Sequence, residues 1–125
     1  FASSRLSYEQ NIVRDKFPDN TMLVDVEGVQ GWYYTFRDEF NVEYEMYAYF
    51  DGNAYQVKVV SPHVEGKYSS IHDCHLYPDG RICFGDLYAG GLPSLENVFA
   101  KSVIWANGFT VYETTKQYPF STNNL

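Results

Sequence analysis

The sequence predicts an α+β fold in a single domain over residues 1–125, built from a short helix, a four-stranded antiparallel meander and a long second helix. Three observations lead to this prediction. Apolar residues recur at helical spacing over 7–17 and, more extensively, over 94–113. Between 21 and 60 the apolar period is two, which is typical of half-buried strands. A chain of this length can bury one core, so we expect one domain.

The first helix is predicted from Ser7 to Phe17. Ser7 and Gln10 have the spacing of a capping box, in which the two side chains satisfy backbone groups of the first turn. Pro18 cannot continue a helix and ends the run.

Four short strands follow, separated by turn signals. The alternation is clearest over 43–50, where Tyr44, Met46 and Ala48 share one face. We expect that face to cover a core and the opposite face to carry the acidic residues. Gly28 to Gly31 is predicted as a break and Asp51-Gly52-Asn53 as a tight turn. The predicted strands are 22–27, 32–37, 43–50 and 55–60.

The longest helix is predicted from Ser94, a candidate N-cap, to Glu113. Twenty residues rise about 30 Å along the axis, which is enough to cross the sheet. Gly108 lowers helix stability by about 1 kcal/mol relative to alanine, so we expect a close approach or a bend there. Pro119 marks the end of this region, and residues 121–125 are expected to form a loose tail.

Charge and composition argue against several classes of function. The net charge is −7, and the stretch from Asp19 to Asp51 holds eight acidic residues and one base. Nucleic-acid binding needs clustered lysines and arginines, which are absent from the sequence. The acidic stretch is either a solvated sheet face or a surface that attracts a basic partner. No apolar run approaches the ~20 residues of a membrane span, and no leader is recognisable, so we expect no membrane association and a cytoplasmic location.

A possible reactive thiol follows a tight turn. Tyr77-Pro78-Asp79-Gly80 has the residue types of a type I turn, and the short extended piece that follows carries Cys83. Gly85 comes two residues later. We expect this arrangement to place Cys83 on a surface ledge, because a nucleophilic thiol must be accessible.

The segment from His75 to Gly85 resembles the active-site segment of the ubiquitin-conjugating (UBC-like) enzymes. That family combines a His-Pro-Asn tripeptide, a Tyr-Pro-Asp/Asn-Gly turn and an Ile-Cys-Leu sequence. Here residues 73–75 are Asp-Cys-His, so His75 stands where the family has asparagine. Bacterial members, including those of cyclic-oligonucleotide antiphage systems (CBASS), are more similar. They pair a His-x-Tyr-x-Asp-Gly-x-x-Cys segment with a following helix rich in Trp and Tyr, like the one predicted at 94–113. The resemblance covers 61–120.

The resemblance implies a UBC-like fold without the family's two extra C-terminal helices. It implies that Cys83 receives, as a thioester from an activating enzyme, the C-terminal tail of a ubiquitin-like protein or of a nucleotidyltransferase. Cys83 would then pass this tail to an amine, normally a lysine of a target protein. His75 would donate to the oxyanion of the transition state or only hold the turn in place. Asp86 is a candidate to orient or deprotonate the lysine. No cofactor is expected.

Other interpretations of the same residues remain open. The chain is alternatively a UBC-like or RWD-like binding module without activity, with an incidental cysteine. His72, Cys74, His75 and Cys83 are zinc-ligand types, but their spacing is poor, so no metal is expected. Cys74 is a redox partner of Cys83 or a buried, inert residue. A serine hydrolase is disfavoured, because no Gly-x-Ser-x-Gly motif occurs.

Overall fold

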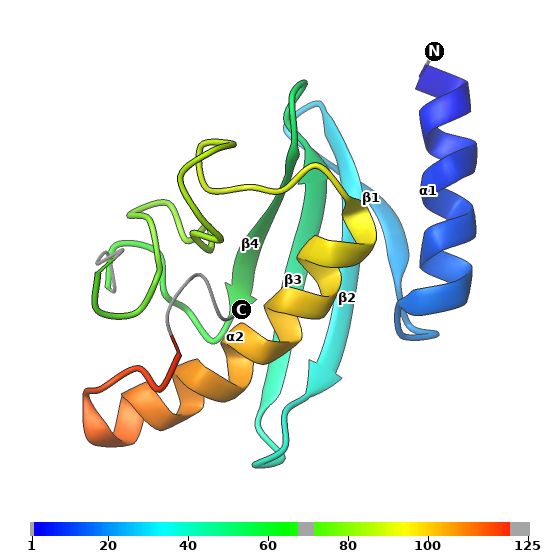
Figure 1. Ribbon diagram of the computed structural model, residues 1–125. Helices are drawn as coiled ribbons and strands as arrows, with labels where there is room; N and C mark the ends of the chain where they lie inside the picture. Colours follow the sequence, from blue (N-terminus) through cyan, green and yellow to red (C-terminus); the bar gives the residue numbers. More distant parts are fainter. Residues whose placement is uncertain (1, 68–71, 121–125) are drawn as a thin grey trace.

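The computed structural model describes residues 2–67 and 72–120 and has the predicted α+β organisation. Four antiparallel strands form one sheet in the order β1-β2-β3-β4, and the long helix α2 crosses one of its faces (Figure 1). The elements are α1 (Ala2–Lys16), β1 (Met22–Val26), β2 (Val29–Arg37), β3 (Glu43–Phe50), β4 (Tyr55–Ser61) and α2 (Leu95–Thr115). The expected loose tail at 121–125 lies outside the described residues.

The predicted break at 28–31 is wrong, because β1 and β2 are joined by a two-residue turn. Glu27 and Gly28 both have positive φ, 54° and 86°, as in the hairpin turns that match the natural twist of paired strands. β2 therefore starts at Val29, directly opposite Val26. Gly31 is a strand residue, and the ring of Tyr47 on β3 occupies the space that a Cβ at Gly31 would need.

The predicted start of α1 at Ser7 is also wrong, because the helix already includes Ala2. Its first turns are tied to the rest of the protein through Glu9. This buried carboxylate accepts hydrogen bonds from Trp32 Nε1 at 2.9 Å and from the Tyr55 hydroxyl at 2.7 Å, and it pairs with Arg5 at 3.2 Å. Arg5, which precedes Ser7, also lies over the Phe50 ring of β3 at 4.8 Å, so a tertiary contact that a capping pattern does not contain holds the start of α1.

The core lies between the sheet and the two helices, as the alternation of β3 predicts. Tyr34, Met46, Trp105 and Phe109 are fully buried there. Ser94 is the N-cap of α2 as predicted, and its side chain accepts from the Asn97 N–H at 3.2 Å.

Gly108 is the predicted point of close approach. A Cβ at Gly108 would lie 2.5 Å from Cζ of Tyr118, because the chain after α2 turns back and lays that ring on the helix.

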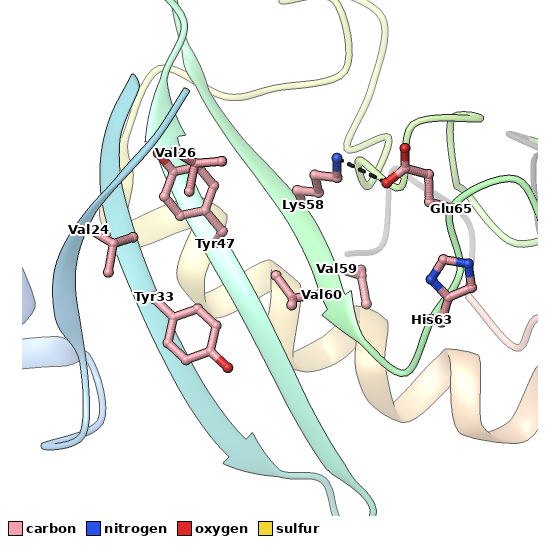
Figure 2. A pocket seen from close by; sticks show the side chains of 9 residues that line it. All are labelled: Val24, Val26, Tyr33, Tyr47, Lys58, Val59, Val60, His63 and Glu65. Atoms are coloured by element: carbon pink, nitrogen blue, oxygen red, sulfur yellow. Dashed lines mark ion pairs between the residues drawn. The ribbon is translucent and has the colours of Figure 1, made fainter. Parts of the chain in front are cut away.

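The outer face of the sheet is less acidic than expected. Val24 and Val26 of β1, Tyr33 of β2 and Tyr47 of β3 line an apolar groove of about 370 Å³ (Figure 2). The Lys58–Glu65 ion pair, at 3.2 Å, borders it. Alternation over 43–50 places Tyr47 on the outer face correctly, but it does not predict that Val24 and Val26 of β1 gather there with it.

Candidate functional site

The segment that carries Cys83 is anchored to both layers of the fold. At its start, the Cys74 carbonyl accepts a hydrogen bond from Trp105 Nε1 of α2 at 2.9 Å. At its end, Ile82 N–H donates to the Val57 carbonyl of β4 at 2.9 Å. The predicted turn lies between these points, closed by the Gly80 N–H donating to the Tyr77 carbonyl at 3.0 Å. The backbone around the thiol is therefore fixed by the core.

Cys83 is buried, with 4% of its surface exposed, so the expectation of an exposed ledge is wrong. Its neighbours Ile82 and Phe84 both pack into the core. After Phe84 the chain forms a loop that returns on itself, and the Phe84 N–H donates to the Gly90 carbonyl at 2.7 Å. The Cys83 Sγ lies 3.6 Å from the Gly85 carbonyl oxygen within this loop. Sequence signals identify the turn before the thiol but not the loop that folds back after it.

Tyr77 lies directly beside the thiol. Its ring stacks under the Arg81 guanidinium, with 4.5 Å from Cζ to the ring centroid. The ring edge packs on Gly90, where a Cβ would lie 2.5 Å from Tyr77 Cε2. Burial raises the pKa of Tyr77 to about 12, and the neighbouring Cys83 side chain acts in the same direction.

His75 is connected to Cys83 through the backbone, whereas its ring contacts the C-terminal segment. The Cys83 N–H donates to the His75 carbonyl at 2.8 Å. The His75 ring is buried, its Nε2 lies 3.1 Å from the Phe120 carbonyl oxygen, and it meets Tyr118 edge-on at a centroid distance of 4.6 Å. The ring also lines a cavity of about 540 Å³ formed with residues 72–73 and 116–120. A role for His75 at the oxyanion stays a prediction.

Asp86 is exposed and belongs to the loop that follows the thiol. Its charge is close enough to Tyr77 to contribute, after burial and the contact with Cys83, to the raised pKa of that tyrosine. Leu87, the next residue, is 91% exposed. Asp86 thus lies in the segment that follows Cys83, and its charge acts on Tyr77 of the preceding turn.

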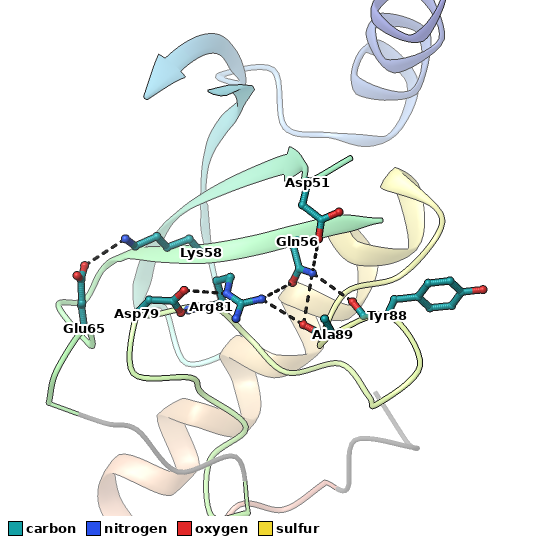
Figure 3. Close-up of polar contacts among 8 residues, drawn as sticks. All are labelled: Asp51, Gln56, Lys58, Glu65, Asp79, Arg81, Tyr88 and Ala89. Atoms are coloured by element: carbon teal, nitrogen blue, oxygen red, sulfur yellow. Dashed lines mark hydrogen bonds and ion pairs between the residues drawn. The ribbon is translucent and has the colours of Figure 1, made fainter. Parts of the chain in front are cut away.

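A polar network attaches this loop to β4 (Figure 3). The buried Gln56 side chain donates to Asp51 at 3.0 Å and to the Tyr88 carbonyl at 3.3 Å. Arg81 joins it by donating to Gln56 Oε1 at 3.2 Å, to the Ala89 carbonyl at 3.1 Å and to Asp79 at 2.8 Å.

The sequence patterns described above assign no role to Arg81 or to Gln56. The available signal is the position of Gln56, a single amide in a strand of largely apolar residues. A buried amide needs hydrogen-bond partners, so such a position predicts a polar attachment.

The structure bears on the alternative roles proposed for the two cysteines. Cys74 is 1% exposed, which agrees with a buried residue, and both cysteines are free. Within 2–67 and 72–120, no cluster of three or more His, Cys, Asp or Glu side chains has a metal-binding arrangement. The helices in these same ranges are all too short or too polar to cross a bilayer.

Comparison of the chain with protein-family models, with curated proteins and with solved structures gives no match.

Proposed function

We propose that this protein is a bacterial-type, UBC-like conjugating enzyme that carries a protein tail as a thioester on Cys83. The main support is the local geometry of 75–83: a closed Tyr-Pro-Asp-Gly turn, followed by a cysteine whose N–H is bonded to the His75 carbonyl. The order of helix, four-stranded meander, loop and crossing helix agrees with the UBC-like layout.

The reaction has two acyl-transfer steps. In the first, the Cys83 thiolate attacks the C-terminal carbonyl carbon of the tail, which the activating enzyme holds as a thioester. A new C–S bond forms on Cys83, and the activating enzyme's thiolate leaves and takes up a proton. In the second, a lysine amine attacks the same carbon, a C–N bond forms and the C–S bond breaks. The amine loses a proton and the released Cys83 thiolate gains one.

Asp86 and His75 are assigned supporting roles in the second step. Asp86 is exposed on the loop after the thiol, where a carboxylate can accept the proton of an incoming amine. His75 would donate to the oxyanion from a ring nitrogen, which requires the ring to leave the Phe120 carbonyl.

The antiphage setting follows from the same resemblance. In the CBASS relatives the tail belongs to the nucleotidyltransferase itself, so both this tail and that of a ubiquitin-like protein are appropriate donors.

The experiment is to incubate the protein with its activating enzyme and each type of tail, and to separate the products with and without reductant. We expect an adduct that reductant removes and that Cys83→Ala does not form. Cys74→Ala is the matched control, since it removes the other thiol of the chain, and it should form the adduct normally. Failure of the wild type to form an adduct with either tail argues against the enzyme.

The burial of Cys83 and the apolar groove of Figure 2 favour a second candidate, a protein-binding adaptor without activity. Exposed apolar side chains gathered on one sheet face are typical of interaction surfaces. An adaptor would leave Cys83 unacylated under all conditions of the adduct experiment, so the same measurement separates the two candidates.

A further inference from the structure

The two edges of the sheet differ in what lies beside them. Beyond β4, the Ile82 N–H donates to the Val57 carbonyl at 2.9 Å, and the Tyr55 N–H donates to the Leu92 carbonyl at 2.8 Å. These segments cover the β4 edge. β1 stands at the other end of the strand order and pairs with β2 alone (Figure 1).

The register of the β1–β2 hairpin shows which backbone groups of β1 face the open edge. Val26 and Val29 flank the two-residue turn, so they exchange both backbone hydrogen bonds, and bonded pairs alternate with unbonded pairs from there. Val24 and Val26 therefore bond to β2. The N–H and C=O groups of Leu23 and Asp25 point outward, and no strand or loop of 2–67 and 72–120 pairs with them.

β1 lacks the devices that keep many edge strands from pairing with another chain, which are lysine, proline or a bulge. Its sequence is Met-Leu-Val-Asp-Val, so four of its five residues are apolar. Met22 is 56% exposed, Leu23 39% and Val26 49%. The register shift of the sheet lies between β3 and β4, away from this edge. An apolar edge strand of this kind is a template for a further strand.

The two faces of β1 define the chemistry of that further strand. On the outer face, Val24 and Val26 line the apolar groove (Figure 2), so apolar side chains at alternate positions of an added strand would lie beside it. On the opposite face, Asp25 presents an exposed carboxylate. The charged residues from 17 to 36 are Asp19, Asp25 and Glu27, all acidic. A lysine or arginine on this face of the added strand would complement the charge.

Charge disfavours a second copy of this chain as the occupant. In the antiparallel register that pairs Leu23 with Asp25 of the other copy, the two Asp25 carboxylates are diagonal neighbours on one face. Each copy also carries a net charge of −7. Like charges at this spacing repel, so a basic segment fits the edge better than a second β1 does.

We propose that the β1 edge binds an extended segment of a partner protein as a fifth strand, with apolar side chains toward the groove and a lysine or arginine beside Asp25. The backbone groups of Leu23 and Asp25 supply affinity, and the alternation of apolar and basic residues supplies specificity. This surface does not include Cys83, so the inference goes beyond the proposed function and applies equally to an enzyme and to an adaptor.

Amide hydrogen exchange, followed residue by residue by NMR, tests the edge in the wild-type chain. In the free protein the Leu23 and Asp25 N–H groups should exchange at least about tenfold faster than those of Val24 and Val26, which bond to β2. A synthetic peptide of about seven alternating valines and lysines should slow exchange at Leu23 and Asp25 at least about threefold. A peptide of the same composition, with its lysines in one block, is the control and should slow neither.

The role of the carboxylate is tested with Asp25→Asn, which keeps a side-chain oxygen to accept from the Gly28 N–H, as Asp25 does at 2.8 Å. Dissociation constants come from fluorescence anisotropy of the labelled peptides. Asp25→Asn should weaken binding of the valine–lysine peptide about threefold and leave binding of a valine–glutamine peptide unchanged. Glu39→Gln is the matched control, because it removes the same charge from an exposed position outside β1, and it should change neither constant.

Three results would overturn the proposal. The first is that the alternating peptide slows exchange at neither Leu23 nor Asp25, or slows it no more than the block peptide does. The second is an equal effect of Asp25→Asn and Glu39→Gln on binding. The third is slow exchange at Leu23 and Asp25 in the free protein that becomes slower as protein concentration rises, because a second copy would then occupy the edge. The peptide experiments involve no acylation, so a missing adduct on Cys83 would refute the proposed function and leave this inference standing.

Discussion

Replacing Gly108 with alanine puts one methyl group under the ring of Tyr118. The new Cβ would lie 2.5 Å from Cζ, 2.7 Å from the hydroxyl oxygen and 2.8 Å from Cε2 of that ring. These distances are too short for carbon–carbon or carbon–oxygen contacts, so the ring must move. The Tyr118 hydroxyl also donates a hydrogen bond to the Trp105 carbonyl at 3.0 Å, and movement of the ring would strain or break that bond.

The expected magnitude comes from opposing effects. Alanine in place of glycine stabilises a helix interior by about 1 kcal/mol. Overpacking of a well-packed site costs about 1–3 kcal/mol, and loss of one hydrogen bond costs about 1 kcal/mol. We therefore expect Gly108→Ala to lower the free energy of unfolding by about 1–3 kcal/mol.

The assay is urea unfolding followed by circular dichroism, in the wild-type and Tyr118→Ala backgrounds. Without the Tyr118 ring the clash disappears, and Gly108→Ala should become stabilising by about 1 kcal/mol. Thr114→Ala, at an exposed position of the same helix, is the control and should have the same small effect in both backgrounds. If Gly108→Ala is equally stabilising in both backgrounds, Tyr118 does not pack on Gly108 and the described return of the chain is wrong.

Three further predictions concern the loop and its surroundings. Burial alone raises the pKa of Asp51, but hydrogen bonds from Ala54, Gln56 and Asn53 outweigh it and hold this pKa below its ordinary value. Its contribution to stability is thus present above about pH 4 and is lost as the pH falls through the lowered pKa. The gap in urea midpoint between wild type and Asp51→Asn should therefore be smaller at pH 3 than at pH 7, and a constant gap would refute this. Leu87→Asp should change the free energy of unfolding by less than about 0.5 kcal/mol, because the side chain is exposed. It should nevertheless slow adduct formation at least about tenfold if the loop meets the partner, and an unchanged rate would rule out that contact. In single-turnover discharge to lysine, His75→Ala should be about 100-fold slower than wild type if the ring stabilises the oxyanion, and His75→Asn should recover much of the loss. Normal discharge by His75→Ala would leave His75 with only its contacts to Tyr118 and Phe120.

Regular periodicity explains how much of the fold is predictable from the sequence. The strand 43–50 and the helix beginning after Ser94 are predicted at their observed starts, because alternation and a capping serine act within a few residues. The first helix is misplaced at its start, because Arg5 pairs with Glu9 and lies over Phe50, a residue distant in the sequence.

The candidate site is predictable only in part, for a related reason. The turn at 77–80 depends on local residue types and is found at once. Cys83 is buried where the loop after the thiol returns on itself and the Phe84 N–H donates to the Gly90 carbonyl, a return that the local turn signals do not encode. Gln56 acquires its role from the backbone of Tyr88 and Ala89, a contact that no local pattern encodes.

The most direct test of the central claim replaces the sulfur of residue 83 by oxygen. In the adduct experiment, Cys83→Ser should still accept the tail, but as an oxygen ester that survives reductant, whereas the wild-type thioester is cleaved. Peptide mass mapping should place the acyl group on residue 83 in both proteins. An adduct that keeps its sensitivity to reductant in Cys83→Ser, or that maps to another residue, would contradict the account.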